Sequence, residues 1–237
     1  MALRRVFVEG FGGDRASVGG ARAHHLARVV RLRPGEQLEL SDGRRLFRAL
    51  VAEATPERVE FDLVEEIDAR RPTAQIAVAV AIVRFNRFEW AVEKLTELGA
   101  AEILPIVADR SDPHLCRAAA KRADRWRRIA EEAAQQSRRL EPSRVAAPVS
   151  LAEALERPAV ALFFDAEGER LASVCEDWRG SAEPVTCFIG PEGGWSEAEF
   201  EQAAAKQALV AALPGGVLRT ETAAVAALAA VAALTLS

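Results

Sequence analysis

Apolar and polar residues alternate in short runs along about the first 70 residues, and one helical stretch, roughly Ala21–Arg31, interrupts them. Alternation of this kind is typical of strands that bury one face, and Gly and Asp turns separate the runs. The sequence therefore predicts a small β-rich module. Its expected strands are Arg5–Val8, Gln37–Leu40, Leu46–Val51 and Val59–Val64.

The pattern changes after the proline-containing link Asp68–Thr73, where continuous apolar runs begin to alternate with helical segments such as Asn86–Leu98. Continuous apolar strands between helices indicate a parallel sheet that is covered on both faces. We therefore expect two domains, residues 1–70 and 74–237. The strands expected in the second are Ile76–Val83, Ile103–Val107, Val160–Phe164, Val185–Ile189 and Leu209–Leu213.

Two glycine-bearing loops each leave an expected strand and open an expected helix. The first, Phe188–Ser196, reads FIGPEGGWS, and the second, Leu213–Ala224, reads LPGGVLRTETAA. Glycine lets main-chain N–H and C=O groups approach a ligand closely, and ligands of α/β sheets bind outside the carboxyl ends of the strands. Neither the dinucleotide fingerprint nor the phosphate-binding P-loop is present. The loops predict one pocket for a nucleoside-like ligand.

Helix-start signals accompany both loops. Ser196 and Glu199 form an S-x-x-E capping box directly behind the first loop. In the second loop, Thr220 or Thr222 could cap the apolar helix expected over Ala223–Leu236, and Glu221 would favour its positive end. A cation gains nothing at that end of a helix. Arg219 is therefore the stronger candidate for a functional role. Glu221 and Thr222 could serve either to start the helix or to take part in function.

Composition narrows the class of protein. The chain has 237 residues, of which 50% are hydrophobic, and a formal net charge of −4, as expected for a globular protein. We expect no signal peptide and no membrane span, because the apolar C-terminal run is too short to cross a bilayer. The three cysteines, Cys116, Cys175 and Cys187, show no C-x-x-C spacing, which favours a reducing, cytoplasmic setting. His114 and Cys116 lack further ligand partners, so no metal is expected.

The modest net charge hides clusters of one sign. Basic residues dominate Arg15–Arg48 and Arg117–Arg144, whereas acidic residues dominate Glu53–Asp68. Arginine suits bidentate contacts with phosphate, but solvated helix faces explain such clusters equally well.

The sequence resembles the ribosomal RNA small subunit methyltransferase E family, within the knotted SPOUT superfamily. The resemblance is carried by Ile189–Ser196 together with Val217–Ala223. Further segments agree in order along nearly the whole chain. They are His25–Arg31, Pro34-Gly35, Asp42-Gly43, Lys94–Gly99, Asp109–Ser111, Gln136-Ser137 and Arg139.

The resemblance implies an α/β fold in which an N-terminal PUA-like β-barrel that binds RNA precedes a SPOUT domain with a C-terminal trefoil knot. It also implies a homodimer that uses S-adenosylmethionine to methylate uridine N3 in small-subunit ribosomal RNA, on the assembled ribosomal subunit. The residues implied to hold the cofactor are Ile189, Gly190, Glu192, Gly193, Leu213, Leu218, Thr220 and Thr222.

Methylation at uridine N3 requires loss of a proton, and the resulting anion spreads its charge to O2 and O4. A fixed cation would stabilise the transition state, and Arg219 is the candidate, with Glu221 or a water molecule as proton acceptor. RNA phosphates are expected to meet an arginine track. The candidates are Arg5, Arg28, Arg31, Arg110 and Arg139.

The chain departs from the family pattern at Pro214 and Gly216, where glycine and arginine are usual, and at Gln135 and Arg138. An arginine contact near the cofactor loop is thus missing or supplied from elsewhere. Two alternatives stay open. One is a SPOUT methyltransferase that acts on transfer-RNA ribose, and the other is a non-catalytic RNA-binding factor for ribosome assembly.

Overall fold

The computed structural model describes residues 3–69, 75–176 and 183–235, and the chain divides into two compact units. Unit 1 comprises residues 1–71 together with 134–141, and unit 2 comprises 72–133 and 142–237. The sequence did not indicate that residues 134–141 return to the first unit. Most of the link expected at Asp68–Thr73, and Leu236 at the end of the expected apolar helix, lie outside the described residues.

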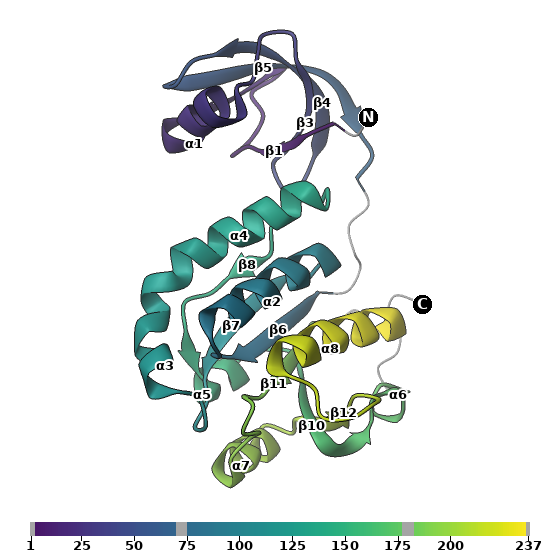
Figure 1. Ribbon diagram of the computed structural model, residues 1–237. Helices are drawn as coiled ribbons and strands as arrows, with labels where there is room; N and C mark the ends of the chain where they lie inside the picture. The colour runs from purple at the N-terminus through teal and green to yellow at the C-terminus, as the bar shows by residue number, and fades with distance from the viewer. Residues whose placement is uncertain (1–2, 70–74, 177–182, 236–237) are drawn as a thin grey trace. The chain divides into compact units, whose positions relative to one another are not determined.

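Unit 1 is built on a five-stranded half-barrel sheet with the order β1-β3-β4-β5-β2, in which only the β1–β3 pair is parallel. Alternate residues such as Val6, Val18 and Leu38 point into one apolar core. The PUA-like fold is thus confirmed (Figure 1). The strands are β1 (Arg5–Phe7), β2 (Arg15–Gly19), β3 (Gln37–Ser41), β4 (Leu46–Ala54) and β5 (Arg58–Ile67).

The helix expected over Ala21–Arg31 begins one residue earlier and changes type midway. An α-helical turn, α1 (Gly20–His24), continues into a π-helical segment, η1 (His25–Val30). Arg31 then takes a left-handed conformation, with φ of 61°, and ends the segment.

A buried ion pair joins β1, β3 and the returning segment 134–141 within unit 1. Arg5 lies opposite Glu39 in the β1–β3 ladder, and their side chains are 2.7 Å apart. Arg138 contacts the other oxygen of Glu39, and Arg5 also donates to the main-chain oxygens of Arg138 and Arg139. These contacts explain why residues 134–141 belong to the first unit.

Unit 2 contains a parallel sheet with the order β12-β10-β11-β6-β7-β8, and β9 also pairs with β7. Successive residues of each strand point into different clusters: Cys187 and Ile189 into one, and Phe188 into the other. The expected sheet buried on both faces is confirmed. The strands are β6 (Ile76–Ala81), β7 (Glu102–Val107), β8 (Arg144–Val145), β9 (Val149–Ser150), β10 (Val160–Arg170), β11 (Val185–Ile189) and β12 (Leu209–Ala212).

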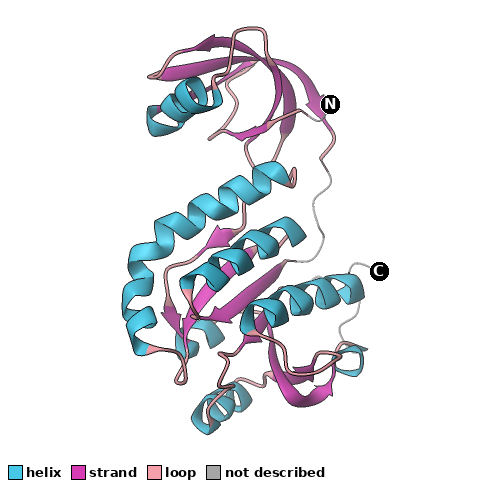
Figure 2. Ribbon diagram, in the orientation of Figure 1, coloured by secondary structure: helices cyan, strands magenta, loops and turns pink. Residues whose placement is uncertain are grey.

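Helices cover both faces of this sheet (Figure 2). One apolar cluster contains residues of α2 (Phe85–Leu98), α4 (Ala123–Gln136) and α8 (Thr220–Thr235). The other contains residues of α5 (Leu151–Leu155) and α7 (Glu197–Ala205). The remaining helices of the described residues are α3 (Pro113–Ala119), η2 (Ala120–Arg122) and α6 (Leu171–Val174). The trefoil knot stays a prediction.

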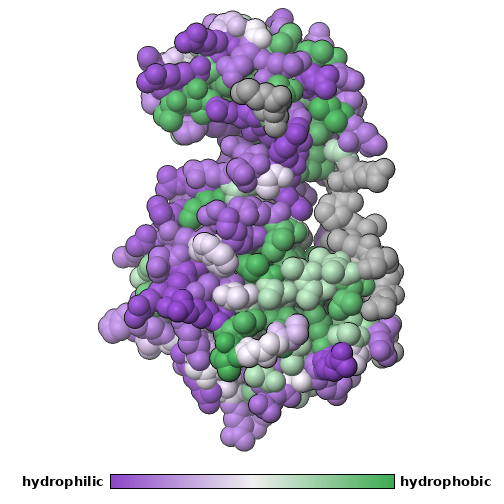
Figure 3. All heavy atoms as spheres, turned by 45° about the vertical axis from the view of Figure 1, so that its right-hand side comes forward, coloured by the Kyte–Doolittle hydropathy of each residue, from purple (hydrophilic) through white to green (hydrophobic). Residues whose placement is uncertain are grey.

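The outer face of unit 2 carries apolar surface as well. Figure 3 shows green and pale green side chains gathered in the region where α8 lies in Figure 1. α8 consists entirely of Ala, Val and Leu from residue 223 to residue 234, and it packs against α2, whose Trp90 and Leu98 are exposed.

Candidate active site

The first glycine loop follows β11 and is folded around a buried tryptophan. The indole Nε1 of Trp195 donates to the main-chain oxygen of Phe164 at 3.2 Å, and its ring packs on Phe163 with centroids 4.5 Å apart. A Cβ added at Gly190 would lie 3.1 Å from the indole. A larger residue at position 190 would therefore have to push the buried tryptophan aside.

The capping box predicted behind this loop is confirmed. The Ser196 hydroxyl accepts from the main-chain N–H of Glu199, and the Glu199 carboxylate accepts from that of Ser196. Both side chains also reach Asp109, after β7: the Ser196 hydroxyl donates to its carboxylate at 2.6 Å, and Glu199 accepts from its main-chain N–H at 2.9 Å. The loop is thus tied to the segment that follows β7, which lies two strands away from β11 in the sheet.

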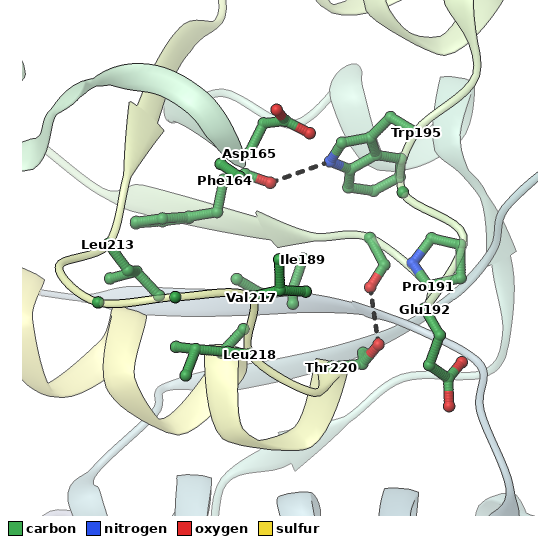
Figure 4. Close-up of a pocket in the computed structure, with 16 residues that line it drawn as sticks. Phe164, Asp165, Ile189, Pro191, Glu192, Trp195, Leu213, Val217, Leu218 and Thr220 are labelled. Carbon is green, nitrogen blue, oxygen red and sulfur yellow. Dashed lines mark hydrogen bonds between the residues drawn. The ribbon is translucent and has the colours of Figure 1, made fainter.

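The second glycine loop runs from the end of β12 to α8 and is far more exposed. Residues 214–219 are all exposed, and 93% of Val217 is accessible to solvent. At its end, the Thr220 hydroxyl donates to the main-chain oxygen of Gly190 at 3.0 Å, which joins the two loops (Figure 4).

Both loops and the middle of β10 enclose a pocket of about 210 Å³, as the sequence predicted for the loops (Figure 4). Its walls are mostly apolar side chains and glycine backbone. Asp165 and Glu192 are the ionisable side chains among its described lining residues, so the lining carries no basic group. The pocket is lined by Phe164, Asp165, Ala166, Ile189, Gly190, Pro191, Glu192, Gly194, Trp195, Leu213, Gly215, Gly216, Val217, Leu218, Thr220 and Ala223.

The structure brings most of the predicted cofactor residues to this pocket but not Gly193 or Thr222. Gly193 faces Arg110 instead, and its main-chain oxygen accepts from the Arg110 guanidinium at 2.7 Å. Thr222 is exposed on α8 and is absent from the lining. The predicted residues that do line the pocket are Ile189, Gly190, Glu192, Leu213, Leu218 and Thr220.

Sequence reasoning missed the contribution of β10. Phe164 of β10 pairs with Ile189, the last residue of β11, so Phe164 and Asp165 lie beside the carboxyl end of β11, where the pocket forms. The expected strand Val160–Phe164 ended at this edge, which was the available signal. Trp195 also lines the pocket, although the sequence places it in the first loop without indicating this role.

The two catalytic candidates have opposite surroundings. Arg219 is exposed, and among the described residues its side chain has no hydrogen-bond or ion-pair partner. Glu221 is buried, with Oε1 3.7 Å from Nε of Arg87 and Oε2 unpartnered among the described residues. Arg87 also donates to Glu192 at 3.0 Å, so one arginine of α2 connects both loops. Neither Arg219 nor Glu221 lines the pocket itself.

Of the predicted RNA contacts, Arg5 must be withdrawn. It is 6% exposed, and its guanidinium is occupied by Glu39 and by main-chain oxygens, so it cannot reach a phosphate without breaking the core of unit 1. Arg28 and Arg31 are exposed in unit 1. Arg110, in unit 2, is exposed but holds the first loop. Arg139 is half-buried, and burial lowers the pKa of its guanidinium.

Other classes of site are not found in the described parts of the chain. They contain no group of three or more His, Cys, Asp or Glu side chains placed to hold a metal ion. His114 accepts instead from the Arg117 guanidinium at 2.9 Å. Burial raises the pKa of the Cys187 thiol, so this cysteine is unreactive. Across residues 3–69, 75–176 and 183–235, every helix is too short or too polar to traverse a lipid bilayer.

Comparison with known proteins adds independent findings. Residues 69–232 match the model of an RNA methyltransferase domain, and residues 18–64 match that of an RNA methyltransferase PUA domain. The ribosomal RNA small subunit methyltransferase E of Bacillus subtilis is 31% identical over 229 residues, which cover 91% of this chain and 88% of that protein. Its counterpart from Mycobacterium tuberculosis is 33% identical over 233 residues, covering 94% and 88%.

A solved structure agrees over the full length. The ribosomal RNA small subunit methyltransferase E of Neisseria gonorrhoeae, bound to S-adenosylmethionine, superposes with a TM-score of 0.85 at 27% identity and covers 98% of both chains.

Proposed function

We propose that this chain, which belongs to the ribosomal RNA small subunit methyltransferase E family, transfers a methyl group from S-adenosylmethionine to N3 of a uridine in small-subunit ribosomal RNA, on the assembled subunit in the cytoplasm. The observation that carries the proposal is that both glycine loops line one and the same pocket.

The residues of the pocket suit an S-adenosylmethionine molecule. Phe164, Ile189, Leu213 and Leu218 offer apolar walls for a purine ring, and the glycine backbone offers hydrogen-bonding groups at close range. The lining carboxylates suit a cationic ligand. When bound, this cofactor supplies an electrophilic methyl group on a positively charged sulfur.

The protein's part in the reaction is to position the uridine and to stabilise the charge that develops on it. In this proposal, Arg219 lies against O2 or O4 of the base as N3 loses its proton. Its exposed, unpaired guanidinium is free to approach a substrate, which supports the assignment. Glu221 or a water molecule accepts the proton, and the unpartnered Oε2 of Glu221 supports the first of these.

RNA binding and assembly complete the proposal. Arg28 and Arg31 of unit 1, with Arg110 and Arg139, contact RNA phosphates, so binding weakens as salt rises. The protein works as a homodimer, for which the exposed apolar side chains of α2 and α8 are the supporting surface. Light scattering of the purified protein tests the dimer.

The test of function is methyl transfer to small-subunit particles from a strain that lacks the gene. We expect N3-methyluridine at one position of the ribosomal RNA, identified by nucleoside mass spectrometry and mapping. Methylated ribose or methylated transfer RNA would replace the proposed target with the superfamily alternative. Binding of cofactor and RNA without any transfer would favour the assembly factor.

A further inference from the structure

The middle of β10 carries a bulge that places Asp165 in the lining of the pocket. Phe164 and Glu169 both pair with Ala211 of β12, so residues 165–168 are extruded from the ladder. A Cβ on Gly168 would lie 2.6 Å from the main-chain carbon of Ala211, so only glycine permits this close approach. The bulge is therefore held firmly by backbone packing, and Asp165 is its first residue.

Asp165 is also the lining carboxylate without a balancing cation. One of its oxygens accepts from the main-chain N–H of Glu167 at 3.0 Å, and no ion pair reaches it from the described residues. Glu192, the other acidic lining residue, is paired with Arg87 at 3.0 Å. In Figure 4, Asp165 lies beside Phe164, on the side of the pocket opposite Thr220. The pocket thus holds one uncompensated negative charge.

We propose that Asp165 makes the pocket select the sulfonium form of its ligand over the neutral sulfide that remains after methyl transfer. This inference rests on the proposed function. S-adenosylmethionine carries a sulfonium, an ammonium and a carboxylate, and so has a net charge of about +1 at neutral pH. Transfer moves the methyl group to uridine N3 and leaves both electrons of the broken S–C bond on sulfur, and the N3 proton goes to the acceptor.

The product S-adenosylhomocysteine therefore differs from the cofactor chiefly by one positive charge and one methyl group. A fixed carboxylate attracts the cofactor and loses that attraction when the sulfur becomes neutral. Asp165 is a specificity-determining residue in this account, and its physiological effect is to ease release of the product. The charge is removed by Asp165→Asn with little change in shape.

The experiment is calorimetric titration of wild-type protein and variants with S-adenosylmethionine and, separately, with S-adenosylhomocysteine. For Asp165→Asn we expect Kd for the cofactor to rise about tenfold and Kd for the product to change less than about twofold. A single charge–charge contact that solvent partly screens typically changes affinity by about tenfold. The matched control is Glu167→Gln, in the same bulge but outside the lining, and should change neither Kd.

Equal weakening of both ligands by Asp165→Asn would overturn the inference, because it would place the carboxylate against a part that both share, such as the ribose. No weakening of either would overturn it too. If Asp165→Asn unfolds, Asp165→Glu keeps the charge and must keep the wild-type preference. Failure of wild-type protein to bind S-adenosylmethionine would instead refute the proposed function.

Discussion

The two loops that build the pocket are held in very different ways. The first is fixed by Trp195, by the Ser196 capping box and by Arg110, which together tie it to β10, α7 and the end of β7. The second is exposed from residue 214 to residue 219 and is anchored mainly where Thr220 meets Gly190.

This difference separates two tasks within one site. A braced loop supplies a cofactor surface whose shape exists before binding, which reduces the entropy lost on binding. A loop with few buried contacts opens locally at low cost, as segments that admit ligands commonly do. Arg219 lies at the end of the exposed loop. The proposed catalytic cation is therefore carried by the loop that can rearrange when a ligand binds. Substitutions in the first loop should therefore affect stability, and those in the second should affect activity.

The largest effect is expected from Trp195→Ala, which removes the buried side chain that braces the first loop. The free energy of unfolding should fall by about 3–5 kcal/mol, measured by urea denaturation. Val217→Ala, in the exposed loop, is the control and should change stability by less than about 0.5 kcal/mol. Similar losses from both would remove the distinction between the loops.

Arg219→Ala should reduce kcat for methyl transfer by about 10²–10³-fold, because one charge-stabilising group is removed from the transition state. Cofactor Kd and the melting temperature should stay near the wild-type values, since the side chain is exposed and does not line the pocket. Arg84→Ala, at another exposed arginine, is the control. A near wild-type rate in a variant that still binds cofactor would refute the role of Arg219.

A smaller effect should follow from adding one methyl group to each loop. Gly190→Ala forces a Cβ against Trp195 and should cost about 1–3 kcal/mol of stability, measured by denaturation, with weaker cofactor binding. Gly216→Ala meets nothing within 4 Å and should cost less than about 0.5 kcal/mol. If position 216 proved the more sensitive, the second loop would be the constrained one.

In unit 1, local patterns predicted most strands but not the contacts between them. β2 was missed because Arg15–Gly19 offers just two buried apolar residues, Ala16 and Val18. Arg5 was assigned to RNA because the sequence does not show that Glu39 faces it across the β1–β3 pair. Residues 134–141 could not be placed, because their contacts with this unit span about a hundred positions.

The contacts of residues 134–141 limit how the proposed RNA-binding role of unit 1 can be tested. A truncation that begins near Thr73 would leave Arg138 and Leu140 without their partners Glu39 and Ser41, so loss of RNA methylation in it would be ambiguous. Substitution of the exposed Arg28 and Arg31 is the cleaner test.

In the pocket, the glycine loops could be predicted because their residues are local and chemically distinctive. The place of Asp165 in the pocket lining could not be predicted, because it depends on a bulge set by Gly168 and Ala211, which meet only in the folded sheet. The motif also does not reveal that the Arg110 guanidinium contacts Gly193, which is absent from the pocket lining, so the cofactor contact expected at Gly193 stays a prediction.

Hydrogen exchange with and without S-adenosylmethionine tests the central claim most directly, because it reports on both loops in one experiment. We predict that amides of residues 215–219 exchange rapidly in the free protein and slow markedly on binding. The amide of Gly194, which donates to the main-chain oxygen of Pro191 within the first loop, should already be protected and change little. Unchanged exchange in both loops at saturating cofactor would contradict the assignment of this pocket.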